Sequence, residues 1–496
     1  MTPYEQLTER FRRIGLIGDT LGVLEWDTAT MLPQGSAPVR GEQTATLSVL
    51  RHELLTHGDV GALLDAAGDG NGDHDAWTAA NLREMRGAYA RATAVPPDLV
   101  EAEARAVSAC EMTWRTARAQ DDFELLRPFL EEVLRLTRER GQAVGAALGL
   151  DPYDALLDEF EPGGRARRID ALFDDLAGFL PDFVAAALER QAARPAPVAP
   201  KGPFPLDRQR ALGVRLMEVI GFDFTRGRLD VSAHPFCGGA AGDVRITTRY
   251  DEADFLSALM GVLHETGHAM YELGLPERWR HQPVGVARGM GVHESQSMIV
   301  ELQVCRGREF MAFAAPLMRD AFDGRGPVWE AENLYRLATV VAPGFIRVDA
   351  DEATYPAHVI LRYRLERALV AGDLRLADLP GAWAEGMQDL LGLTPPDDRL
   401  GCLQDIHWPG GLWGYFPTYV LGAMTAAQLF DAATRADPGL RPAIARGDFL
   451  PLMRWLRANV HEKGSLLSSE ELVTQATGRP LDPAVFEAHL KARYLD

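Results

Sequence analysis

Apolar residues recur at helical spacing along most of this chain, most clearly over residues 123–148 and 169–190, which are rich in Ala, Leu, Glu and Arg. Residues 243–250 alternate instead, with Val244 and Ile246 on one side and Arg245 on the other. That period of two predicts a strand with one buried face. The pattern as a whole predicts a mainly α protein with a small edge β-sheet.

A helix is expected directly after this strand. Asp251 is a suitable N-cap, and an apolar stripe that begins at Phe255 runs into His264. Gly274 and Pro276 supply stop signals at the other end. A strand edge beside such a helix would let an extended peptide pair with the sheet.

The 496 residues are expected to form one large domain, 1–496, with a possible lobe boundary in the Pro-rich segment 193–205. Segment 69–75, DGNGDHD, is predicted to be a polar loop, because His74 and Ala80 stand where a calcium loop needs Gly and Glu. No apolar run is long enough for a membrane span, and the N-terminal residues lack the apolar stretch of a signal peptide.

Composition and charge limit the partners. Hydrophobic residues make up 47% of the chain and charged residues 25%, as in ordinary soluble globular proteins. The net charge of -20 argues against nucleic acid and against anionic membrane surfaces, because both are bound through Lys and Arg. The four cysteines are far apart in sequence, which is typical of reduced thiols and predicts a cytoplasmic location.

The chemistry begins with residues 264–268, HETGH, an H-E-x-x-H motif inside the expected helix. His264 and His268 would project from one helix face and bind one metal ion, and Glu265 would accept a proton from a metal-bound water. Two buried histidines with a buried Glu between them would be costly without a metal, so a metal site is favoured over structural histidines. The motif therefore predicts metal-assisted hydrolysis of a peptide bond.

A hydrolytic zinc site usually has three protein ligands, and Glu294, 26 residues after His268, is the predicted third. It lies in GVHESQSMIVELQ, an expected helix that could cross the first. Glu272 and Glu301 are the alternatives. Glu272 shares one straight helix with both histidines and would close poorly around an ion, and Glu301 would need a different crossing point. Two His and one Glu suit one Zn²⁺ per chain, and Co²⁺ could substitute.

With these residues placed, the sequence resembles the carboxypeptidase Taq family of metallopeptidases. The matching motifs run in order along nearly the whole chain. They are LEWDTATMLP at 24–33, HPF at 234–236, DVRIT at 243–247, HETGH at 264–268, HESQS at 293–297, IRVDAD at 346–351 and GCLQDIHW at 401–408.

The resemblance implies an almost all-helical fold in which two lobes flank a deep central groove with the metal at its floor. It implies a metallocarboxypeptidase that removes single residues, with broad specificity, from peptides with a free C-terminus, and that forms a homodimer. His264, His268 and Glu294 would bind the metal, and Glu265 would be the general base.

Donors beyond the metal are also expected. His407 and Tyr419 are predicted to stabilise the oxyanion, with Tyr415 as a further substrate-facing residue, because their layout resembles that of related helical metallopeptidases. A free carboxylate is best bound by arginine, so Arg347 is the predicted anchor. Arg245 is the second candidate, although it could instead pair with a nearby acid.

Two points stay open in the sequence. Related metallopeptidases often place an Asp four residues after the Glu ligand to orient a histidine, and this chain has Met298 there, so Asp349 or Asp351 is expected to take that place. No role follows for His234 or His293.

Two other functions compete with this prediction. An oligopeptidase or a dipeptidyl carboxypeptidase could use the same scaffold and would differ in where the groove ends. A non-catalytic, acidic helical interaction protein with a degenerate site is the remote alternative, and the intact ligand set argues against it.

Overall fold

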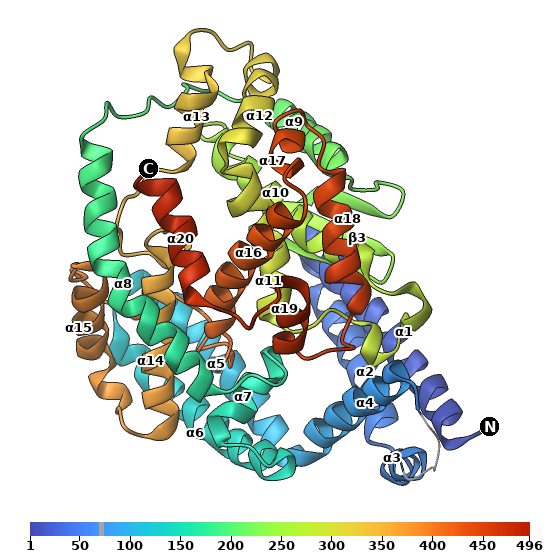
Figure 1. The fold of residues 1–496 in the computed structure, drawn as a ribbon. Helices are drawn as coiled ribbons and strands as arrows, with labels where there is room; N and C mark the ends of the chain where they lie inside the picture. The colour runs from blue at the N-terminus through green and yellow to red at the C-terminus, as the bar shows by residue number, and fades with distance from the viewer. Residues whose placement is uncertain (69–73) are drawn as a thin grey trace.

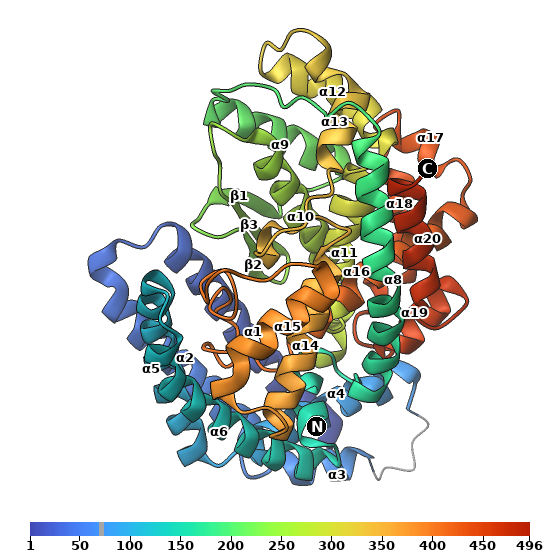
Figure 2. The ribbon, with the colours of Figure 1, turned by 90° about the vertical axis from the view of Figure 1, so that its left-hand side faces the viewer.

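The computed structural model describes residues 1–68 and 74–496 and confirms the mainly helical fold with one small sheet (Figure 1). In both ribbon views α1–α6 occupy the lower side, and the sheet, α9 and α12 occupy the upper side (Figures 1 and 2). Most of the predicted polar loop at 69–75 lies outside the described residues.

The chain begins with α1 (Pro3–Thr30), α2 (Ala37–Thr56), α3 (Val60–Gly68), α4 (Ala76–Ala94), α5 (Pro97–Gln120), α6 (Phe123–Leu148), α7 (Pro152–Phe160), α8 (Ala166–Ala192) and α9 (Leu206–Ile220). The middle part contains β1 (Gly227–Val231), β2 (Phe236–Ala240), β3 (Asp243–Thr248), α10 (Phe255–Gly274), α11 (Met290–Met298) and a π-helix (Ile299–Cys305). The last part contains α12 (Arg308–Ala321), α13 (Ala331–Ala338), α14 (Tyr355–Ala371), α15 (Leu379–Leu391), α16 (Pro417–Ala436), α17 (Leu440–Ile444), α18 (Leu450–Asn459), α19 (Ser469–Thr477) and α20 (Pro483–Tyr494).

The amphipathic segments form the helices that their spacing predicts. Helix α6 spans the predicted range 123–148, and α8 contains the predicted range 169–190. The carboxylate of Asp122 caps α6 by accepting a hydrogen bond from the Leu125 N–H at 3.0 Å. Gly149, with φ of 69°, ends the helix in the left-handed conformation that glycine adopts without strain.

The sheet corrects one expectation. Strand β3 is the central strand of three, parallel to β1 and antiparallel to β2, so its edges are already paired. Only one alternating segment, 243–250, was recognised in the sequence, and the two strands that pair with it were not predicted. Helix α1 packs against β2 so closely that a Cβ atom on Gly22 would lie 2.2 Å from the Gly239 carbonyl oxygen. A substrate therefore has no free edge of β3 with which to pair.

The start of α10 lies three residues later than predicted. Asp254 is the N-cap, and its carboxylate accepts from the Leu256 and Ser257 N–H groups, each at 3.1 Å. The Glu252 carbonyl accepts from the Phe204 N–H at 2.8 Å, and Asp251 instead stabilises the preceding turn. The predicted end at Gly274 is confirmed.

The hydrophobic core crosses the predicted lobe boundary. One large cluster includes residues as far apart as Cys110 and Leu490, and a smaller cluster joins α1, α3 and α4. Segment 193–205 connects α8 to α9, and buried apolar residues of both helices belong to the large cluster. The single-domain organisation stays a prediction.

The structure also describes the apolar content of the helices and the state of the cysteines. Within residues 1–68 and 74–496, no helix is both long and apolar enough to cross a membrane. All four cysteines, among the described residues, are free, and three of them are buried.

Candidate active site

The three predicted metal ligands meet where α10 and α11 cross. His264 and His268 come from α10 and Glu294 from α11, and one ligand atom of each lies within 4.8 Å of the others. The His264 Nε2 atom is 3.7 Å from one oxygen of Glu294, and the His268 Nε2 atom is 3.5 Å from the other. Two imidazoles and a carboxylate converging in this way form a donor set that fits a divalent metal such as zinc.

Glycine makes the close crossing of these helices possible. A Cβ atom on Gly267, inside HETGH, would lie 2.4 Å from the Gln296 carbonyl oxygen and 2.5 Å from the Ser297 Cα atom. Helix α16 packs closely against Glu294, because a Cβ atom on Gly422 would lie 2.8 Å from the Glu294 Cβ atom. The ligand geometry therefore depends on two backbone positions that carry no side chain.

Gly267→Ala is expected to destabilise the protein by about 3 kcal/mol and to weaken metal binding, because the added methyl group would push α11 away from α10. Gly261→Ala on the same helix is the control, since a Cβ atom there meets no described atom within 4 Å. The control should gain roughly 0.5 kcal/mol through helix propensity. Chemical denaturation and zinc titration measure both effects, and equal behaviour of the two variants would contradict this account.

His264 has a carboxylate partner that the sequence did not assign. Its Nδ1 atom lies 2.9 Å from Glu301, which also accepts from Arg306 at 2.7 Å. Burial alone would raise the pKa of Glu301, but Arg306 and His264 outweigh burial and lower it to about 2. Glu301, an alternative metal ligand in the sequence analysis, lies in the π-helix and contacts the Nδ1 atom of His264, whereas the Nε2 atom faces Glu294.

His268 is held by a second chain of hydrogen bonds. Its Nδ1 atom lies 2.6 Å from Nδ1 of His293, and Nε2 of His293 lies 2.8 Å from Glu272. The expectation that Asp349 or Asp351 orients a ligand histidine is therefore wrong.

Asp351 has a different task. Its carboxylate accepts from the backbone N–H groups of Ala353 and Thr354, just before α14.

The two glutamates considered as alternative ligands, Glu272 and Glu301, are the outer hydrogen-bond partners of the histidines. His293, which had no role in the sequence, joins His268 to Glu272.

Glu301→Gln is expected to weaken metal binding roughly 10-fold, the lower end of the usual loss when an outer partner of a metal ligand is removed. The single amide oxygen of Gln cannot accept from both His264 and Arg306. Glu309→Gln is the control, because Glu309 also pairs with an arginine, Arg441, but on α12 away from the ligands. Competition with a chelating dye gives both affinities, and an unchanged affinity in Glu301→Gln would contradict the assigned role.

Glu265 lies on α10 between the two histidines and is 7% exposed. Burial and the nearby Glu294 charge raise its pKa to about 7 against the opposing effect of His264. A carboxylate with a pKa near neutrality can both accept and release a proton at physiological pH. Burial and the Glu265 charge also raise the pKa of the Cys237 thiol on β2.

The predicted oxyanion donors lie together. The His407 Nε2 atom is 3.2 Å from the Tyr419 hydroxyl, and the Tyr415 and Tyr419 rings are 5.3 Å apart. Burial lowers the pKa of His407 to about 4, so its ring is neutral at pH 7. Burial raises the pKa of Tyr419 to about 12, so its hydroxyl keeps its proton. Glu294 contributes to the raised pKa values of both tyrosines, which places their hydroxyls within electrostatic range of the metal site.

Arg347 is buried beside these tyrosines and is fixed by Asp405. Its Nε and Nη2 atoms donate to one oxygen of Asp405 at 3.1 and 2.8 Å, and Arg362 donates to the other oxygen at 2.6 Å. The remaining Nη1 atom of Arg347 is 3.3 Å from the Tyr355 hydroxyl, and the guanidinium lies 5.1 Å from the Tyr419 ring centre. Asp405 thus orients Arg347 and occupies its Nε–Nη2 edge, while the Nη1 atom contacts the Tyr355 hydroxyl.

Arg245 lies in a different setting. Its guanidinium donates to Asp243 on the same strand at 2.6 Å and stacks over the Trp26 ring at 4.3 Å. This is the pairing with a nearby acid that the sequence left open. Nothing in these contacts joins Arg245 to the ligand residues.

A cavity of about 1280 Å³ extends from the outer partners of His268. Glu272 and His293 form part of its wall, together with β2, the middle of α1 and residues of the loop before α11. The cavity thus borders the Nδ1 side of His268, and His264, His268 and Glu294 do not line it.

The comparisons with known proteins agree with this geometry. Residues 6–494 match the family described as carboxypeptidase Taq (M32) metallopeptidase. Thermostable carboxypeptidase 1 of Thermus thermophilus is 40% identical, over 100% of this chain and 99% of that protein. The solved structure of Trypanosoma cruzi metallocarboxypeptidase 1 superposes with a TM-score of 0.97 at 41% identity, covering 100% of this chain and 99% of that one. The M32 carboxypeptidase from Deinococcus radiodurans gives 0.93 at 36% identity, with 99% and 98% covered.

A helical metallopeptidase is the class that fold and site define. The chain belongs to the carboxypeptidase Taq (M32) family and is a metallocarboxypeptidase, as its sequence motifs predicted. The non-catalytic alternative is wrong. The family implies a metal ion and peptide substrates, and the cluster of His264, His268 and Glu294 offers the metal a site.

Proposed function

We propose that the protein is a zinc carboxypeptidase that hydrolyses the last peptide bond of peptides and releases single C-terminal amino acids with broad specificity. One observation carries the proposal. The cluster of His264, His268 and Glu294 is flanked by a buried Glu265, and the Glu294 charge raises the pKa of Tyr419, whose ring centre lies 5.1 Å from the Arg347 guanidinium.

The metal supplies one part of the chemistry. When bound by His264, His268 and Glu294, a zinc ion would act as a Lewis acid toward the scissile carbonyl and make water more acidic. Co²⁺ suits the same ligands and could replace it. The outer bonds from Glu301 and His293 fix both imidazole rings, so that each Nε2 atom stays turned toward Glu294.

Glu265 handles the protons. Its carboxylate accepts a proton from the attacking water and then gives it to the leaving amine, which requires a pKa close to the working pH. The buried position of Glu265 in α10 favours such a value.

The His407–Tyr419 pair stabilises the oxyanion. If His407 carries its proton on Nε2, it donates to the Tyr419 hydroxyl oxygen and leaves the hydroxyl proton free to donate to the oxyanion. Tyr415 packs against Tyr419 and borders the residue that is released.

Arg347 selects the C-terminus. Its Nη1 atom, which contacts the Tyr355 hydroxyl, would bind the substrate carboxylate, while Asp405 holds the Nε–Nη2 edge. Arg245 stays a second candidate for this task.

An N-terminally blocked peptide, offered with a free or an amidated C-terminus, tests the proposal. Mass spectrometry over time should show single residues leaving the free end one after another. The amidated peptide should react roughly 100-fold more slowly, because a charged bond to arginine is lost. Release of dipeptides, or internal cuts in either peptide, would instead support the dipeptidyl carboxypeptidase or oligopeptidase alternative.

The assembly and location belong to the same proposal. Helix α2 exposes apolar side chains along its length, including Val39, Val49 and Leu50, which supports a homodimer. Light scattering coupled to size exclusion gives the mass in solution, and a monomer at micromolar concentration would contradict the dimer. The free cysteines support a cytoplasmic location.

A further inference from the structure

Helix α11 carries Glu294 and His293, yet its first turn has no capping side chain of its own. The N-cap position is Gly289, with φ of 45°, and the helix begins at Met290. The first N–H groups of a helix need acceptors, and burying them without acceptors is costly. The acceptor comes from a distant part of the chain.

Glu161, directly after α7, fills this position. One of its carboxylate oxygens accepts a hydrogen bond from the Gly291 N–H at 3.0 Å, across 130 residues of sequence. The side chain is buried, and the Ser469 hydroxyl at the start of α19 donates to its other oxygen. A carboxylate at the start of a helix also interacts favourably with the helix dipole.

Two glycines admit this carboxylate. A Cβ atom on Gly289 would lie 2.9 Å from the Glu161 Oε2 atom, and one on Gly291 would lie 2.7 Å from the same atom. Side chains at these two positions would displace the cap. The close approach of α7 to α11 therefore depends on Glu161 at the end of α7 and on the two glycines at the start of α11.

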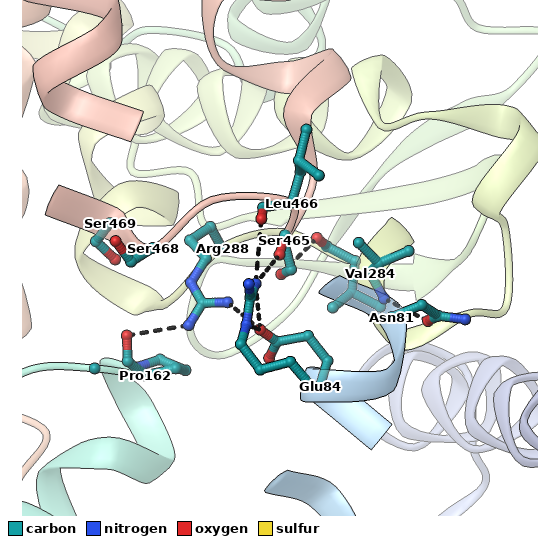
Figure 3. A network of polar contacts seen from close by, with 12 residues as sticks. Asn81, Glu84, Pro162, Val284, Arg288, Ser465, Leu466, Ser468 and Ser469 are labelled. Atoms are coloured by element: carbon teal, nitrogen blue, oxygen red, sulfur yellow. Dashed lines mark hydrogen bonds and ion pairs between the residues drawn. The ribbon is translucent and has the colours of Figure 1, made fainter. Parts of the chain in front are cut away.

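A polar network fixes the segment that enters α11 (Figure 3). Arg288 pairs with Glu84 of α4 at 2.8 Å and donates to the Pro162 carbonyl oxygen at 3.1 Å. Figure 3 shows Arg288 between these two partners, with Ser468 and Ser469 close by. Arg288 thus joins the segment before α11 to α4 and to the segment after α7, and Glu161 joins α11 to the start of α19.

We infer that Glu161 is a positioning residue for the metal site, because its carboxylate caps α11 and so fixes where Glu294 meets the two histidines. This inference rests on the proposed function, in which Glu294 is the third metal ligand. Gly291 precedes Glu294 by three residues, so an unfastened first turn would let the ligand move. The effect of Glu161 is on metal affinity, since its known contacts are to the helix and not to a substrate.

Zinc and cobalt affinities of the full chain test the inference. Glu161→Ala should weaken both affinities roughly 10-fold, as loss of an outer partner of a ligand usually does. Glu161→Gln keeps an oxygen that can accept from the Gly291 N–H and should restore most of the affinity. The visible absorption spectrum of the Co²⁺ form should shift in Glu161→Ala and return toward wild type in Glu161→Gln.

Asp151→Ala is the matched control. Asp151 caps the start of α7 by accepting from the Tyr153 N–H at 3.0 Å, so its loss costs one helix cap without touching α11. This control should lower the melting temperature and leave the metal affinity and the Co²⁺ spectrum unchanged. Equal loss of affinity in the control and in Glu161→Ala would overturn the inference.

The remaining outcomes are also decisive. Wild-type affinity and spectrum in a folded Glu161→Ala variant would overturn the inference and leave the proposed function intact. If wild-type protein bound no stoichiometric zinc or cobalt, the proposed function itself would fail. If Glu161→Ala did not fold, Ser469→Ala would decide, with a smaller affinity loss expected and an unchanged affinity overturning the inference.

Discussion

Glu265→Gln should lower kcat by about 10³-fold, because the variant keeps the shape of the side chain and loses the group that moves the proton. Metal content should stay at the wild-type level, since Glu265 is not among the three clustered ligand residues. Stability of the metal-free protein should not fall, because burial already opposes ionisation of this carboxyl group and raises its pKa to about 7. Steady-state kinetics, metal analysis and thermal unfolding check the three parts.

The control for this variant is Glu252→Gln, an exposed residue just before α10, which should keep wild-type kcat. Residual activity of Glu265→Gln near the wild-type level, with full metal content, would contradict the role of Glu265. Loss of activity together with loss of metal would show instead that the substitution damages the site itself.

Arg347→Met should lower kcat/KM roughly 100-fold on peptides with a free C-terminus, because a charged hydrogen-bonded contact to the substrate carboxylate is lost. The same variant should no longer distinguish free from amidated peptides. Asp405 keeps its bond to Arg362 in this variant, so it is not left as an unpaired buried charge. Kinetics on the matched pair of peptides separates this specific loss from a general one.

Arg245→Met provides the direct comparison, since Arg245 is the other candidate arginine. Its pairing with Asp243 and its stacking on Trp26 predict a smaller effect that is equal for free and amidated peptides. If Arg245→Met alone abolished the preference for a free C-terminus, the substrate carboxylate would be bound by Arg245 on β3 and not by Arg347.

Local sequence patterns were sufficient for long amphipathic helices such as α6 and for the residues that gather at the metal site. The four-residue spacing in HETGH fixes two imidazoles on one helix face, and Glu294 followed from the helix expected around it. His407 and Arg347 lie in the family motifs, Tyr419 was added from the layout of related helical metallopeptidases, and the structure groups these three side chains. Their roles stay predictions for the kinetic tests above.

Three features depend on long-range packing and could not be predicted from local sequence patterns: the position of β3 in the sheet, the partner of Glu301 and the partner of His293. Residues 243–250 were the only strand predicted, and the pairing with β1 and β2 makes β3 the central strand. Glu301 lies in a π-helix and pairs with the Nδ1 atom of His264, and the sequence pattern anticipated neither. His293 gave one signal, its place inside HESQS, but its contact with His268 depends on the crossing at Gly267.

Titration of metal-free protein with zinc, while the release of C-terminal residues is recorded, tests the central claim most directly. Activity should rise linearly and stop rising at one zinc per chain, and Glu294→Ala should show no such break. Activity that is independent of added metal, or full activity of Glu294→Ala at one equivalent, would contradict the assignment of the three-residue site.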